Sequence, residues 1–155
     1  MLSTKPFVPR AFSVIKNAAI KPVIFCLLGI SNLSIKILPF RILMRFFANS
    51  ETEPEIELTG KNQARVGLIG RQVISVSKYT PWRSKCFEQA LTAAFILKLL
   101  GISYKIYFGV NTENGPSSHA WVMVGEKNVT GQHTNVVFTP VKAFFYRSKK
   151  DRNKM

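Results

Sequence analysis

Apolar residues follow two different periods in the second half of the chain. Between residues 86 and 100 they recur every three or four positions, which predicts a helix, and Gly101 provides its C-terminal stop. From residue 102 the pattern alternates, which predicts a strand with these apolar residues on one face: Ile102, Tyr104, Ile106 and Phe108. A second strand-like run extends from His119 to Val124. The change of period predicts a helix followed by paired strands.

Turn-forming residues connect the predicted strands. The segment 111–118 contains an Asn-Gly-Pro run, which is turn chemistry. Gly125 and Glu126 predict a two-residue hairpin loop that leads into a third strand. Pairing through this loop places Gln132 directly opposite His119.

The first half of the chain is apolar and basic. Pro22 and Pro39 are expected to break residues 1–50, which hold seven Lys/Arg and no acid, into short helical pieces. An acidic cluster then marks a linker over residues 51–65, and it consists of Glu51, Glu53, Glu55 and Glu57. The sequence therefore predicts a basic helical arm, a linker, a folded domain over residues 66–146 and a basic tail over residues 147–155.

The location of the arm has two interpretations. Only fourteen uncharged residues separate Lys21 from Lys36, fewer than the roughly 18 to 20 that span a membrane. The arm is then expected either to lie on an anionic membrane surface or to pack on the domain over residues 66–146 or on a partner protein. No small-x-small site follows a compact apolar core, so no cleavable signal peptide is expected.

Length, charge and cysteine content narrow the class of protein. A chain of 155 residues holds one domain. Its net charge of +14 is spread over arm, middle and tail, and no nucleic-acid-binding motif is present, so nucleic-acid binding is not expected. The basic tail is expected to be a solvated charge run. Two cysteines form no disulfide framework, which indicates a reducing cytoplasm. No metal-ligand cluster and no cofactor motif is present in the sequence.

Cys86 and His119 are the candidates for catalysis. Cys86 lies in the first turn of the predicted helix, where the helix dipole and the cationic neighbours Arg83 and Lys85 favour the thiolate. His119 opens a strand thirty-three residues later, as the base of a cysteine nucleophile does. Ser84 or Thr80 is expected to cap the helix, with Pro81 as a start signal. The alternative is a core cysteine, because a lone Cys on an apolar helix is more often buried than catalytic.

A catalytic imidazole also needs a group that orients it. The single aspartate, Asp151, lies in the basic tail, which argues against a Cys-His-Asp triad. Gln132 is therefore predicted to orient His119 through its amide oxygen, with Glu126 and Thr130 as weaker candidates on the same hairpin.

An ordered set of motifs resembles a known family. The run 81–91, with Gly101-Ile102, Phe108-Gly109-Val110 and His119-Ala120-Trp121-Val122, is similar to the leader peptidases of lasso-peptide biosynthesis, within the transglutaminase-like, papain-related superfamily. Thr130-Gly131 and the run 138–141 match the family's tail, and residues 38–41 match its N-terminal stretch. The resemblance spans roughly residues 66 to 146.

The resemblance implies an α+β, papain-like half-barrel with an N-terminal helical arm, in which Cys86 is the nucleophile and His119 the general base. The family's aspartate falls at Gly131, so the third catalytic group is atypical here. The implied function is a cytoplasmic cysteine peptidase, peripheral to the membrane if the arm binds lipid, that removes the leader from a lasso-peptide precursor. The implied partners are the precursor peptide, a leader-recognition protein and an ATP-dependent lactam synthetase. The alternatives are a transglutaminase-like acyltransferase and a non-catalytic scaffold of the same complex.

Overall fold

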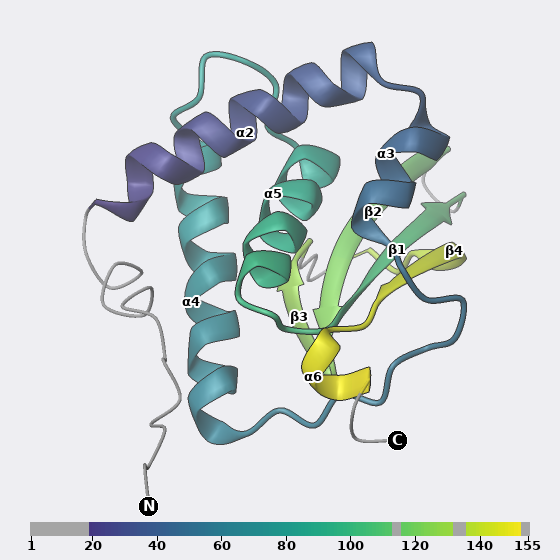
Figure 1. Ribbon diagram of the computed structural model, residues 1–155. Coiled ribbons are helices and arrows are strands. Elements are labelled where there is room, and N and C mark those ends of the chain that lie inside the picture. The colour runs from purple at the N-terminus through teal and green to yellow at the C-terminus, as the bar shows by residue number, and fades with distance from the viewer. Residues whose placement is uncertain (1–18, 113–115, 132–135, 153–155) are drawn as a thin grey trace, which may run out of the picture.

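Helices pack on one face of a four-stranded antiparallel sheet (Figure 1). The computed structural model describes residues 19–112, 116–131 and 136–152. The helices are α2 (Ile20–Ile37), α3 (Phe40–Phe47), α4 (Gly60–Ser77), α5 (Cys86–Leu99) and α6 (Lys149–Arg152). The strands are β1 (Tyr104–Asn111), β2 (Ser117–Val124), β3 (Lys127–Thr130) and β4 (Thr139–Tyr146), in the order β3-β2-β1-β4. This arrangement confirms the α+β class, whereas the half-barrel stays a prediction.

The core lies between the sheet and the helices. Alternate residues of β1 and β2 are buried against α5, as the alternating pattern predicted for β1, and they include Tyr104, Ile106, Val122 and Val124. The Tyr104 hydroxyl donates a hydrogen bond to the Phe47 carbonyl oxygen at 2.8 Å. Burial raises the pKa of Tyr104, so this hydroxyl keeps its proton and remains a donor. We call this helix-covered side the inner face and the other side the outer face.

The two N-terminal helices contribute to the same core. Ile24 and Leu28 of α2 are buried, and the Ser31 hydroxyl bonds to that of Thr92 on α5 at 3.0 Å. The expectation that Pro22 breaks this segment is wrong, because Pro22 lies in the first turn of α2, where backbone N–H groups have no intrahelical acceptor. Pro39 does separate α2 from α3. The predicted linker, residues 51–65, includes the start of α4.

The predicted hairpin forms, but its register shifts. Val124 pairs with Lys127 across a two-residue turn in which Gly125 has φ 56°. The pairing then slips between Val122 and Met123, so that Val122 pairs with Thr130. The expectation of an unbroken register through this hairpin is therefore wrong at Val122, whereas the placement of Gln132 opposite His119 stays a prediction. Gln132 itself lies outside the described residues.

The tail is anchored at its start. The Asp151 carboxylate accepts hydrogen bonds from the hydroxyls of Ser103 and Ser148, and the Ser148 N–H donates to Ser103 Oγ at 2.9 Å. The expectation of a fully solvated charge run is wrong at these residues, because the single aspartate ties α6 to the residue that precedes β1.

Candidate active site

Cys86 is the first residue of α5, as the sequence predicted. Its thiol is half-buried, and Lys85 is the residue that precedes the helix. The N–H groups of the first turn have no intrahelical acceptor, so the backbone N–H of Cys86 points out of the helix start. Figure 1 shows that α5 and β2 begin at the same end of the fold. The helix start therefore combines a thiol, a positive dipole end and a backbone donor.

A buried carboxylate fixes the start of α5. Glu88 is only 3% exposed, and its Oε2 accepts the Lys85 N–H at 3.1 Å. Its Oε1 lies 3.5 Å from the Asn32 amide nitrogen of α2 and 3.6 Å from Arg83 Nε. Asn32 also donates to the Arg83 carbonyl oxygen at 2.8 Å. Glu88 thus joins α2, the incoming loop and the residue before Cys86 into one network.

This network replaces the expected cap. Thr80 and Ser84 hydrogen-bond to each other at 2.8 Å, and the Ser84 carbonyl oxygen accepts the Gln89 side chain at 3.0 Å. The expectation that one of these hydroxyls caps α5 is wrong, because the helix begins after Lys85 and is capped by Glu88 three residues on. Sequence analysis missed Glu88, because the residue at the cap position is a lysine and not a usual capping residue.

His119 of β2 is buried, and its ring is held from two directions. Its Nε2 lies 3.0 Å from the carbonyl oxygen of Gly131. The ring stacks on Trp121, with centroids 5.8 Å apart, and packs against Phe138 at 4.8 Å. Because a carbonyl oxygen only accepts, this contact assigns the proton to Nε2 and leaves Nδ1 as the basic nitrogen of the neutral ring.

Gly131 can approach the imidazole because it has no side chain. Its φ is +86°, and an added Cβ would lie 2.7 Å from His119 Nε2 and 2.6 Å from the Trp121 Cβ. An aspartate at this position, as the family resemblance implies, does not fit this backbone. The Gly131 carbonyl instead occupies the position beside the ring, which the sequence did not indicate.

Cys86 and His119 approach one end of the sheet from its two sides. Phe87, next to Cys86, contacts Phe108 of β1 at 5.2 Å on the inner face. Phe108 pairs with the residue after His119, so alternation places the His119 ring on the outer face with Trp121. Within the described residues no hydrogen bond joins the Cys86 thiol to His119, so their pairing stays a prediction.

The other predicted side chains lie away from the ring. Glu126 is exposed in the hairpin turn at the far end of β2. Thr130 pairs with Val122 on the inner face, and its buried hydroxyl has no partner in the described part of the chain. Neither of these two side chains is placed to orient His119.

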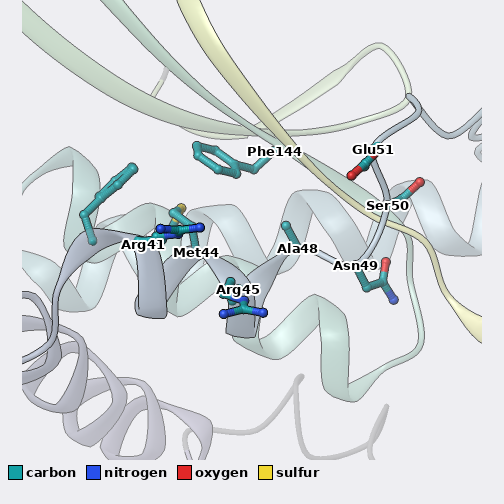
Figure 2. Close-up of a pocket in the computed structure, with 9 residues that line it drawn as sticks. Arg41, Met44, Arg45, Ala48, Asn49, Ser50, Glu51 and Phe144 are labelled. Carbon is teal, nitrogen blue, oxygen red and sulfur yellow. The ribbon is translucent and has the colours of Figure 1, made fainter.

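A hollow of about 510 Å³ lies between α3 and β4. Figure 2 shows Arg41 and Arg45 of α3 on one side and Phe144 of β4 on the other. Phe40 also lines the hollow, and its ring lies 6.1 Å from that of Phe87, the residue after Cys86. The hollow therefore has a lining residue beside the first turn of α5, and its charged side chains are Arg41, Arg45 and Glu51.

We expect Gly131→Ala to destabilise the fold by about 2 kcal/mol more than Gly101→Ala. Both glycines have positive φ, but an added Cβ at Gly101 meets nothing within 4 Å, so the difference isolates the contact with His119 and Trp121. Urea denaturation of both variants measures it. Equal losses of stability would show that Gly131 does not pack against the ring.

Comparison with known proteins places this geometry in a family. The family model described as the transglutaminase-like superfamily matches residues 35–143, from the end of α2 into β4. Searches of curated proteins and of solved structures found no match. The family model covers well over half of the chain, including Cys86 and His119. The chain therefore belongs to the transglutaminase-like superfamily.

Proposed function

We propose that this chain is a cysteine peptidase with Cys86 as nucleophile and His119 as general base. The observation that carries the proposal is the His119 Nε2 contact with the Gly131 carbonyl oxygen at 3.0 Å, because a carbonyl accepts only and so assigns the proton to Nε2 and the basic site to Nδ1. The position of Cys86 at the start of α5 supports the thiolate. Membership of a superfamily that includes cysteine peptidases and acyltransferases agrees with this chemistry.

The proposed reaction has two steps. His119 Nδ1 takes the Cys86 proton, the thiolate attacks the scissile carbonyl carbon, and the imidazolium returns its proton to the leaving amine. Water then hydrolyses the thioester and releases the acid and the free thiol. The Cys86 backbone N–H is the proposed donor to the oxyanion. For this step the thiol and the imidazole, which approach the sheet from its two sides, would have to meet at the end of the sheet where β2 begins.

The proposed substrate is a ribosomally made lasso-peptide precursor, whose leader is removed. The ordered resemblance around Cys86 and His119 supports this choice, and the hollow between α3 and β4 offers a place for an extended peptide beside α5. A leader-recognition protein would present the precursor, and an ATP-dependent lactam synthetase would use the freed amine of the core peptide.

The transglutaminase-like alternative shares the thioester and differs only in the acceptor. Reaction in the presence of a primary amine separates the two functions by mass spectrometry of the leader. A free carboxyl terminus on the leader indicates hydrolysis. An amide of the added amine as the main product would favour acyl transfer.

A direct test of the nucleophile is alkylation by iodoacetamide. We expect Cys86 to react faster than Cys26 near neutral pH, although Cys26 is the more exposed thiol, because Cys86 lies at a helix N-terminus. Peptide mapping after timed labelling of the folded protein measures both rates. Slower labelling of Cys86 than of Cys26 would argue against its role as nucleophile.

A further inference from the structure

The outward side of α2 is an apolar stripe that no other described part of the chain covers. Its residues recur every three or four positions and lie on one side of the helix: Val23, Cys26, Ile30, Leu33 and Ile37. The four aliphatic side chains are 53–67% exposed. The stripe extends from Val23 to Ile37, which at 1.5 Å per residue gives a length of about 21 Å. We call these five residues the α2 stripe.

The opposite side of α2 holds the helix on the protein. Ile24 and Leu28 are buried in the core, and Asn32 donates to the Arg83 carbonyl oxygen at 2.8 Å. By length and composition α2 could cross a membrane. Crossing would remove these contacts from the core, so the fold favours a helix that lies parallel to an apolar surface.

The basic residues around α2 favour an anionic partner surface for the stripe. Lys21 and Lys36 are exposed near its two ends, Arg41 follows on α3, and the first fifty residues contain no acid. A second copy carries the same basic arm, so two facing arms would repel each other, with no acid among residues 19–50 to offset the cations. An anionic surface meets both requirements, because it accepts the apolar side chains and attracts the cations.

We propose that the α2 stripe binds the surface of an anionic lipid bilayer, with α2 parallel to the membrane plane. The aliphatic side chains enter the acyl boundary while Lys36, which flanks the stripe, contacts lipid phosphates. This inference goes beyond the proposed peptidase activity and does not depend on it. It would hold the peptidase, its substrate and its partner enzymes at one membrane surface.

Sedimentation of the full chain with lipid vesicles tests the proposal. We expect binding to vesicles of phosphatidylcholine with phosphatidylglycerol, and weaker binding to phosphatidylcholine alone. The double variant Ile30→Glu/Leu33→Glu should bind the anionic vesicles at least about tenfold more weakly. The matched control is Leu99→Glu/Val141→Glu, which changes the charge equally and removes two exposed apolar side chains outside α2, and it should bind nearly as well as the wild type.

Three outcomes would overturn the proposal. The first is equal loss of binding in the double variant and the matched control, and the second is no sedimentation of the wild type with either vesicle. The third is a concentration-dependent dimer, seen by analytical ultracentrifugation without lipid, that the double variant abolishes, since this would assign the stripe to a second copy. Circular dichroism of each variant confirms that it is folded before binding is compared.

Discussion

Cys86→Ala should reduce leader release at least about a thousandfold, because the reaction then has no nucleophile. The substitution is expected to leave the fold intact, since Cys86 is half-buried at the first position of α5 and its thiol makes no hydrogen bond to another described residue. Release is followed by mass spectrometry with the precursor and the leader-recognition protein. Stability, measured by urea denaturation, should change by less than about 1 kcal/mol.

The control for this experiment is Cys26→Ala. Cys26 is an exposed thiol on α2, so its removal should leave turnover unchanged. Loss of activity in both variants would indicate a general effect of thiol removal. Release by the Cys86→Ala protein at the wild-type rate would leave the scaffold as the better interpretation of this chain.

Glu88→Ala should destabilise the protein by about 2 to 4 kcal/mol, the largest stability effect that we expect from one substitution near the site. The carboxylate accepts the Lys85 N–H, and it lies within 3.5 Å of the Asn32 amide nitrogen, so its loss removes the helix cap and leaves a buried amide with one partner fewer. Turnover should also fall, because the residue before Cys86 loses its anchor. Urea denaturation measures the first effect and leader release the second.

Two further variants make this prediction specific. Glu88→Gln keeps an oxygen acceptor for the Lys85 N–H and should lose less stability than Glu88→Ala. Glu126→Ala removes an exposed carboxylate from the hairpin turn and should change stability by less than about 0.5 kcal/mol. If Glu88→Ala resembled Glu126→Ala, the buried network would not stabilise the start of α5.

Local pattern predicted the elements around the site. The structure contains the predicted helix after Cys86, because its spacing depends only on nearby residues. It also contains the helix stop at Gly101 and the two-residue turn at Gly125, because each depends on a glycine with positive φ. The pattern did not predict the slip between Val122 and Met123. A bulge depends on packing between strands, which a single strand sequence does not record.

Contacts between residues far apart in the sequence account for the features that the sequence analysis did not predict. Glu88 is buried because Asn32, fifty-six residues earlier, reaches it from α2. Asp151 is anchored by Ser103, forty-eight residues earlier. Neither pair has a short-range signal. The group that contacts the His119 ring is the backbone carbonyl of Gly131. The sequence analysis considered only side chains as orienting groups, so it did not predict this contact.

The most direct test of the central claim is intact-protein mass spectrometry of the enzyme quenched during turnover with the precursor. Attack by Cys86 predicts an adduct with the mass of the leader acyl group. This adduct should map to the peptide that contains Cys86, disappear with neutral hydroxylamine as a thioester does, and be absent from Cys86→Ala. Release of the leader without an adduct on Cys86, or with an adduct on another residue, would contradict the account.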